Sequence, residues 1–267
     1  MTEDGNSDGV LKRKLDDVTA VAPAVEANEP SPVLPPPASA ITTNEEEILV
    51  GQPYRGVLPR RVDALDHGCL VISQGSVVDF RGDAIVNAAN RGCLGGGGVD
   101  GAINDAGGYR LEEARRELPV LRPYVRCETG DAKVTIGGDL HVAHVIHAVG
   151  PDYRSCESDE AGDKLLVSAF KASMQAAAKL GAATVAFSLI SAAIFRGDRP
   201  LRTVLSLAIR AVREEAYPHL HEVHLVAFTI TEIRALLVCA QEALGSVTYD
   251  PGREEDAGEL DPQTQLH

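Results

Sequence analysis

Residues 82–108 have the sequence GDAIVNAANRGCLGGGGVDGAINDAGG. The apolar run at 83–88 predicts a short buried strand, and 99–118 predicts a helix with a break near 107–108. Between them lie four consecutive glycines: Gly95, Gly96, Gly97 and Gly98. Glycine has no Cβ, so a ligand can approach this backbone closely, and the amino end of the following helix adds further N–H groups. The segment therefore predicts a binding site for an anion such as a phosphate.

Other interpretations of the glycine run fit less well. A mobile linker would lie in low-complexity sequence, whereas this run connects a buried strand to a helix. A P-loop is excluded because no Lys followed by Ser or Thr comes after the last glycine. A dinucleotide-binding fold would have its glycines after the first strand, without two preceding asparagines.

Three polar side chains flank the glycines. Asn87 and Asn90 close the strand, where a carboxamide can both donate to and accept from ribose hydroxyls. Asp100 lies at the start of the helix, within reach of a ligand held by the loop. Each has a simpler interpretation, since Asn often caps a turn and Asp is favoured by the helix dipole. A carboxylate is a poor neighbour for a diphosphate unless it acts on it, which favours a functional role for Asp100.

The rest of the central region alternates between the two kinds of element. Further strands are expected at 142–149, 184–190 and 222–228, and further helices at 163–180, from 200 onward and at 231–244. Asp163 is expected to cap the first of these helices and Gly181 to end it. This alternation predicts a three-layer α/β/α sandwich with helices on both faces of a sheet.

The charge of the chain is concentrated at its ends. The formal net charge is −14, of which residues 1–49 carry −7 and residues 248–267 carry −5, so only about −2 remains for the middle. Six of the fifteen prolines fall within 23–37. We therefore expect a disordered acidic, Pro-rich tail at 1–62 and a disordered acidic tail at 248–267. The missing basic surplus argues against a nucleic-acid-binding face.

Several classes of protein are disfavoured. No segment has the roughly 20 consecutive apolar residues of a membrane span, and the amino-terminal residues have no leader pattern. Five scattered cysteines form neither a disulfide framework nor a CxxC site. His144 points away from His141 and His147 if all three lie on one strand, so no metal site is expected there. We expect a protein inside the cell, in the cytoplasm, the nucleus or both, and a monomer by default.

Three segments in register resemble the macrodomain family, and specifically its MacroD-type branch. DAIVNAAN followed by LGGGGVDGAI resembles the signature of that branch. CETGDAKVT at 127–135 is similar to the family segment CxTGEAxIT, and VIHAVGPDY at 145–153 is similar to VIHxVGPxY. The likeness spans about 65–245. It implies a macrodomain at 63–247 with a mixed, roughly six-stranded sheet.

The resemblance also implies a ligand, ADP-ribose, and a reaction. MacroD-type enzymes hydrolyse mono-ADP-ribosyl esters on acidic side chains and deacetylate O-acetyl-ADP-ribose, and no metal or cofactor is expected. Asp100 and Asn90 match the catalytic positions, and Asn90 is expected to contact the distal ribose, against which Phe195 packs. The implied ligand-binding residues are Ser76, Val77, Asn87, Ala88, Asn90, Gly95, Gly96, Gly97, Gly98, Val99, Ser191, Ala192, Ala193, Ile194 and Phe195. The expected partners are ADP-ribose and ADP-ribosylated proteins.

Three positions depart from the family pattern. Ser76 stands where an aspartate usually accepts a hydrogen bond from the adenine amino group. Ala193 stands where the second loop usually has glycine, and Asn104 where these enzymes often have histidine. Because binding tolerates such changes better than catalysis, two alternatives to a hydrolase stay open: a non-catalytic ADP-ribose reader, and a binder of a different nucleotide.

Overall fold

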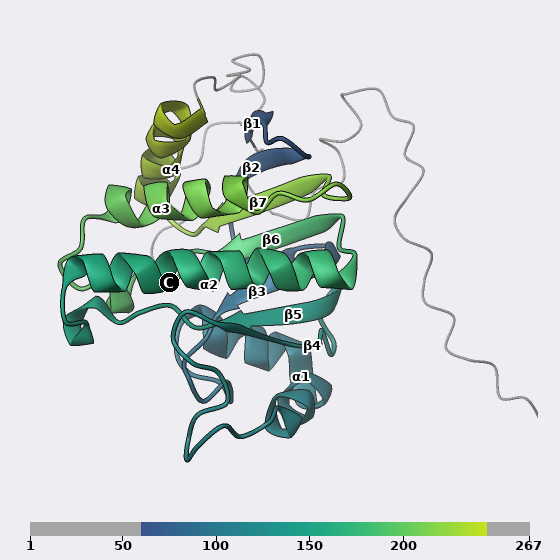
Figure 1. The fold of residues 1–267 in the computed structure, drawn as a ribbon. Coiled ribbons are helices and arrows are strands. Elements are labelled where there is room, and N and C mark those ends of the chain that lie inside the picture. Colours follow the sequence, from purple (N-terminus) through teal and green to yellow (C-terminus); the bar gives the residue numbers. More distant parts are fainter. Residues whose placement is uncertain (1–59, 245–267) are drawn as a thin grey trace, which may run out of the picture. The chain divides into compact units, whose positions relative to one another are not determined.

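The computed structural model describes residues 60–244, and the strands within this range form one mixed sheet (Figure 1). The strands are β1 (Arg60–Ala64), β2 (Cys69–Gln74), β3 (Gly82–Ala88), β4 (Ala132–Ile136), β5 (Val142–Ala148), β6 (Thr184–Ser188) and β7 (Glu222–Ala227). Their order in the sheet is β1-β2-β7-β6-β3-β5-β4. The outer pairs β1–β2 and β4–β5 are antiparallel, and the five strands from β2 to β5 in this order run parallel.

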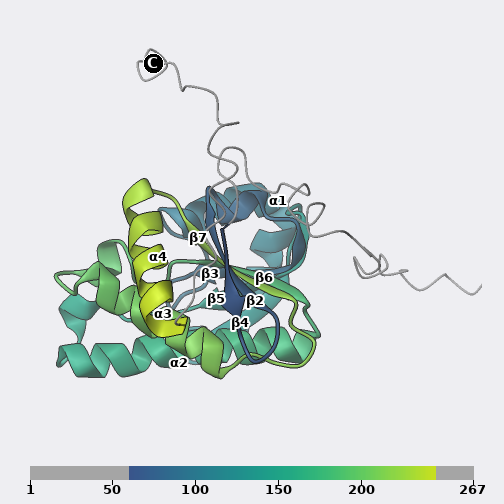
Figure 2. The same cartoon turned by 90° about the horizontal axis from the view of Figure 1, so that it is seen from above.

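Helices cover both faces of the sheet. They are α1 (Val99–Glu117), α2 (Asp159–Leu180), α3 (Leu201–Glu214) and α4 (Ile230–Leu244). Helices α2, α3 and α4 pack on one face, while α1 packs on the other (Figure 2). The short 3-10 helix η1 (Val77–Asp79) packs on the same face as α1. The expected three-layer α/β/α sandwich with a mixed sheet is confirmed, and among the described residues the sheet has seven strands where about six were expected.

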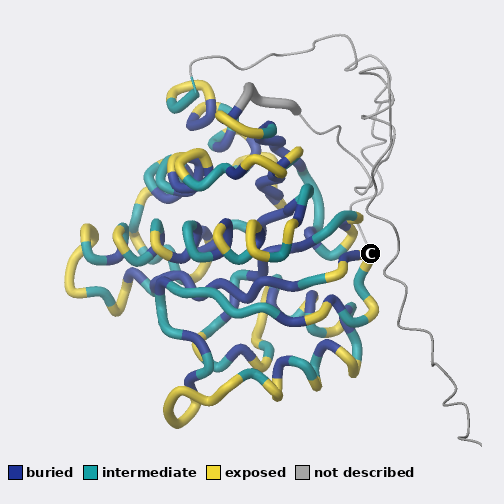
Figure 3. The backbone as a smooth tube through the Cα atoms, turned by 45° about the vertical axis from the view of Figure 1, so that its right-hand side comes forward, coloured by how far each residue is buried: buried dark blue, intermediate teal, exposed yellow. Residues whose placement is uncertain are grey.

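The central strands are buried on both faces, which explains their continuous apolar sequences. In β3, Ala84 and Val86 face the core under α2 and α3, whereas Ile85 faces the core under α1. Figure 3 shows the resulting buried stretches along the strands. In the core under α2, α3 and α4, the Phe170 ring of α2 stacks on Phe187 of β6 with ring centroids 5.4 Å apart.

The parallel direction of five strands brings their carboxyl ends to one edge of the sheet. Ser76 follows β2, Asn90 follows β3 and Ser191 follows β6, so the three expected binding segments share this edge. Strands β2 and β3 are separated by β7 and β6. At roughly 4.8 Å per strand the span between them is about 14 Å, which suits an extended ligand.

Most expected elements are confirmed, but one helix start was wrong. Helix α2 begins at Asp159 with Ser158 as its cap, not at Asp163. Asp163 instead lies inside the helix and accepts hydrogen bonds from Tyr153 and Arg199. Helix α1 does break where expected, because Gly108 has a φ of +63°.

The expected tails fall largely outside the described residues. The segment 248–267 lies entirely outside them, and so do residues 1–59 of the expected amino-terminal tail. Residues 60–62 belong to β1, which therefore begins slightly before the expected domain boundary at 63. Within residues 60–244, none of the helices combines the length and the apolar character needed to cross a bilayer.

Candidate functional site

The loop between β3 and α1 is held together by the side chain of Asn90. Its Oδ1 accepts a hydrogen bond from the N–H of Gly92 at 2.9 Å, and its Nδ2 donates to the carbonyl of Gly95 at 2.8 Å. Gly95 and Gly98 have φ values of +109° and +61°, which favour glycine. Residues 96–98 are exposed, so their backbone is accessible at the amino end of α1.

Asp100, in the first turn of α1, is buried and paired. Its residue is only 3% exposed. Its Oδ1 accepts hydrogen bonds from Asn87 Nδ2 at 2.7 Å and from Arg115 Nη2 at 2.6 Å. Arg115 is fully buried, and its Nε donates to the carbonyl of Cys93 at 2.6 Å. Asn104, one turn beyond Asp100, accepts from Arg115 Nη1 at 3.4 Å.

A hydrogen-bonded chain continues from Asp100 across the sheet. The second N–H of Asn87 Nδ2 meets His147 Nδ1 at 3.1 Å, and His147 Nε2 meets Thr135 Oγ1 at 2.9 Å. The Thr135 hydroxyl in turn donates to the carbonyl of Ile136. These partners assign the imidazole proton to Nε2. Burial, reinforced by the positive charge of Arg115, lowers the pKa of His147 to about 3, so the ring is neutral at pH 7.

Two buried oxygens of this network have no hydrogen-bond partner among the described residues: Asn87 Oδ1 and Asp100 Oδ2. Gly96 lies over the second, because a Cβ built on Gly96 would be 3.1 Å from Asp100 Oδ2 and 3.1 Å from Asn90 Nδ2. An unpaired buried acceptor is costly, on the order of 1–3 kcal/mol. The pair therefore suits a site that receives a hydroxyl or a water when a ligand binds.

The second expected loop, which follows β6, has its strained residue at Ser191 rather than at Ala193. Ser191 has a φ of +54°, and its Oγ donates to the carbonyl of Pro151 at 2.8 Å. Ala193 has a φ of −106°, so the alanine at this position causes no left-handed strain. Ala192 is buried, Ala193 and Ile194 are exposed, and Phe195 is half-buried.

The remaining expected residues already have local structural roles. Ser76 caps η1, since its Oγ accepts from the N–H of Val78 at 3.3 Å, and Val77 is buried beneath. The N–H of Ala88 donates to Ser188 Oγ at 2.9 Å. Val99 begins α1 and is half-buried.

The structure thus groups Asn87, Asn90, Gly96 and Asp100 around one point and places the other expected segments along the same edge. Sequence reasoning missed Arg115. Its signal was weak: Leu111 and Arg115 share one face of the second half of α1, so an arginine stands where an amphipathic helix normally has an apolar residue.

The cysteine beside the loop belongs to a small core. Cys93 and Cys127 are both fully buried and pack with Ala89 and Val149. Cys93 Sγ donates to the carbonyl of Asn90 and Cys127 Sγ to that of Glu128. The proximity of the two thiols lowers the pKa of Cys93 and raises that of Cys127. No group of three or more His, Cys, Asp or Glu within residues 60–244 is arranged to hold a metal ion.

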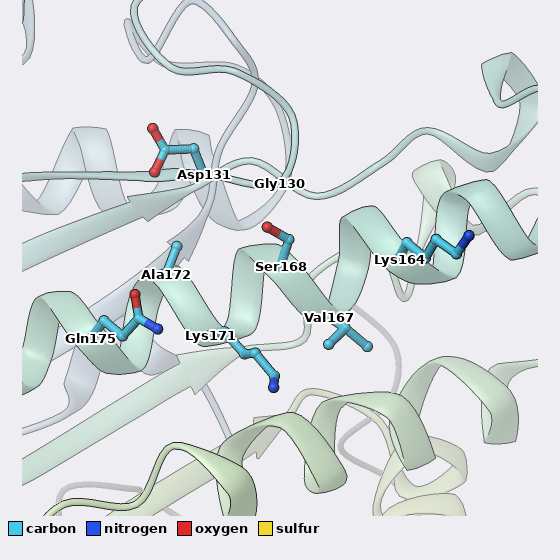
Figure 4. A pocket seen from close by; sticks show the side chains of 8 residues that line it. All are labelled: Gly130, Asp131, Lys164, Val167, Ser168, Lys171, Ala172 and Gln175. Atoms are coloured by element: carbon cyan, nitrogen blue, oxygen red, sulfur yellow. The ribbon is translucent and has the colours of Figure 1, made fainter.

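A separate cavity of about 540 Å³ lies between the start of β4 and the outer face of α2 (Figure 4). Its lining includes Asp131, Lys164, Lys171 and Gln175. None of the expected site residues lines it. Lys171 is paired with Glu214 at 2.7 Å.

Comparisons with known proteins agree on one family. The model of the Macro domain family matches residues 86–206. A macro domain-containing protein of Xanthomonas axonopodis pv. citri is 38% identical over 173 residues, which are 65% of this chain and 93% of that protein. A macro domain-containing protein of Cupriavidus necator is 42% identical over 161 residues, covering 60% of this chain and 90% of the relative.

Solved structures give the same result. The Oceanobacillus iheyensis macrodomain with ADP is similar with a TM-score of 0.61 and 25% identity, covering 70% of this chain and 95% of its own. The Trypanosoma brucei macrodomain in complex with ADP-ribose is similar with a TM-score of 0.54 and 31% identity. That match covers 64% of this chain and 68% of the other.

The buried neutral His147 predicts a specific pH dependence of stability. The unfolded chain binds a proton at this residue below about pH 6.5, whereas the folded state does so only near pH 3. The contribution of the neutral His147 to the free energy of unfolding is therefore present above pH 6.5 and is lost as the pH falls toward 3. Between pH 7 and pH 5 the loss amounts to about 2 kcal/mol of unfolding free energy. Urea unfolding should show this loss in wild type and not in His147→Gln.

The matched control is His144→Gln, on the same strand but outside the network, which should keep the wild-type pH dependence. Equal pH dependence in wild type and His147→Gln would contradict the assignment of a neutral buried imidazole.

Proposed function

The chain belongs to the macro domain family, and from this we propose that it binds ADP-ribose along the carboxyl edge of its sheet and hydrolyses ADP-ribosyl esters there. The substrates would be mono-ADP-ribosyl esters of acidic side chains, O-acetyl-ADP-ribose, or both, as in the MacroD-type branch. The observation that carries the proposal is the buried carboxylate of Asp100, with Oδ1 held by Arg115 and Asn87 and Oδ2 unpaired beside the glycine loop.

Binding follows from the position of the glycine loop. The exposed backbone of 96–98 at the amino end of α1 offers N–H groups and a helix dipole to the diphosphate. Ser191 and its loop approach from the end of β6. Ser76 and Val77 follow β2, about 14 Å along the edge from β3, where the adenine would lie. The complexes of the Oceanobacillus protein with ADP and of the Trypanosoma protein with ADP-ribose support this choice of ligand.

The chemistry assigned to Asp100 requires one water. Its Oδ2 accepts a hydrogen bond from that water and removes a proton as the water oxygen attacks the distal ribose C1″. The bond from C1″ to the ester oxygen breaks, the side-chain carboxylate leaves, and the proton passes to solvent. ADP-ribose is the second product. Asn90 holds the loop over this point through Gly92 and Gly95, and would give up one of these bonds to meet the ribose as the loop shifts.

One observation favours the alternative of a non-catalytic reader. Asp100 Oδ2 is buried beneath Gly96. A ligand must shift this part of the loop before the oxygen can reach a water, and a loop that did not shift would leave a binding site without catalysis.

The proposal predicts release of ADP-ribose from a protein automodified on Glu and Asp. Asp100→Asn is the informative variant, because Asn keeps an acceptor for Arg115, whereas Ala would leave a buried guanidinium unpaired. Release by Asp100→Asn should be at least about 100-fold slower than by wild type, while calorimetry should show ADP-ribose binding largely kept. Asp105→Asn, on the exposed face of the same helix, is the control and should behave as wild type.

The outcomes separate the candidate functions. Binding without release by wild type would make the protein a reader. A wild type that neither bound nor released ADP-ribose would exclude ADP-ribose as the ligand and leave another nucleotide as the candidate.

A gain of affinity is predicted for Ser76→Asp. Aspartate can still cap η1, and it would accept a charge-assisted hydrogen bond from the adenine amino group. Such a bond is worth on the order of 1–2 kcal/mol, so ADP-ribose should bind about tenfold more tightly. The control ligand is the hypoxanthine analogue, which has no 6-amino group and should show no gain. An equal gain for both ligands would contradict this placement of the adenine.

A further inference from the structure

Arg115 is an arginine that the fold buries completely. It is the largest of the fully buried side chains in the described part of the protein. Desolvating a guanidinium costs several kcal/mol unless its donors are paired. Its bonds to Asp100 Oδ1, the Cys93 carbonyl and Asn104 Oδ1 supply that pairing.

The bend in α1 brings Arg115 back to Asp100, fifteen positions earlier in the same element. Gly108 makes the bend with a φ of +63°. This φ, with a ψ of −167°, lies in a region that favours glycine, and an added Cβ would also have to displace the carboxylate of Asp139. The neighbouring Arg116 points outward and pairs with Glu112 one turn away. Burial is therefore specific to Arg115.

The guanidinium binds only one oxygen of Asp100. A fork-shaped pair would engage both carboxylate oxygens through two parallel N–H bonds. Here Nη2 meets Oδ1, while Nε and Nη1 are used on the Cys93 carbonyl and on Asn104. Asn87 also donates to Oδ1. Both donors thus fix the same oxygen, and Oδ2 is left beside Gly96.

We propose that Arg115 is a positioning residue of this site: it orients Asp100 so that Oδ2 is the oxygen that meets the ligand, and it anchors the start of the glycine loop through the Cys93 carbonyl. This inference rests on the proposed function, because it assigns Arg115 a role in the reaction of Asp100. Asn104 completes the arrangement by accepting a hydrogen bond from Nη1 of the guanidinium.

A double-mutant cycle tests the assignment. The variants are Arg115→Lys, Asp100→Asn and the two combined, with Arg116→Lys as the matched control. Lysine keeps the positive charge, but its three N–H donors share one nitrogen and cannot span the acceptors that Arg115 reaches with Nε, Nη1 and Nη2. Arg115→Lys should lower kcat for ADP-ribose release by about 100-fold, with KM and calorimetric Kd changed much less. In the Asp100→Asn background the same substitution should lower kcat by less than about twofold, because its effect passes through the carboxylate. Arg116→Lys should match wild type.

Every other result overturns either this inference alone or the proposed function together with it. An equal loss in both backgrounds, or an unchanged kcat in Arg115→Lys, would show that Arg115 only supports the fold. If wild type binds ADP-ribose without releasing it, Asp100 has no reaction for Arg115 to support, and this inference is overturned while ADP-ribose binding stands. A wild type that neither binds nor releases ADP-ribose overturns the proposed function and this inference with it.

Discussion

The buried ion pair between Asp100 and Arg115 is the interaction on which the rest of the site depends. Both groups are removed from solvent, so each needs the other, and removing one would leave an uncompensated charge in the interior. The pair joins the two ends of α1 across the bend at Gly108 and, through the Cys93 carbonyl, reaches the loop before the glycines. Helix, carboxylate and the start of the loop at Cys93 are therefore fixed as one unit, and the glycines that follow are the part that a ligand must shift.

The sheet supplies the second constraint. Five parallel strands place the loops after β2, β3 and β6 on one edge, while their apolar sequences fill cores on both faces. The neutral His147 extends the Asp100 network into this core, through Asn87 on one side and Thr135 on the other. Arg115 would repel a charged imidazole, and a protonated Nδ1 could not accept the hydrogen bond from Asn87, so the neutral ring preserves the orientation of Asn87.

The sequence was sufficient to predict the layered fold, the break in α1 and the four strands β3, β5, β6 and β7, because these depend on local periodicity and on glycine. It did not predict β1, β2 or β4. It also placed Asn87, Asn90 and Asp100 together, since they are close along the chain. It did not predict Arg115 or Thr135 in the site, because their contacts join positions whose proximity depends on the bend and on strand pairing. The predicted start of α2 was wrong because Ser158 and Asp163 are both residue types that cap helices well. Ser158 is the cap, and Asp163 instead accepts a hydrogen bond from Arg199.

The most direct test of the central claim is a crystal structure of the protein with ADP-ribose bound. We predict the diphosphate on the backbone of 96–99, with Asp100 Oδ2 within hydrogen-bond distance of a ribose hydroxyl or of a water beside C1″. We also predict that the bond from Arg115 to Oδ1 is kept. ADP-ribose bound elsewhere, for instance in the cavity between β4 and α2, would contradict the account. So would a complex in which Gly96 still covers Oδ2.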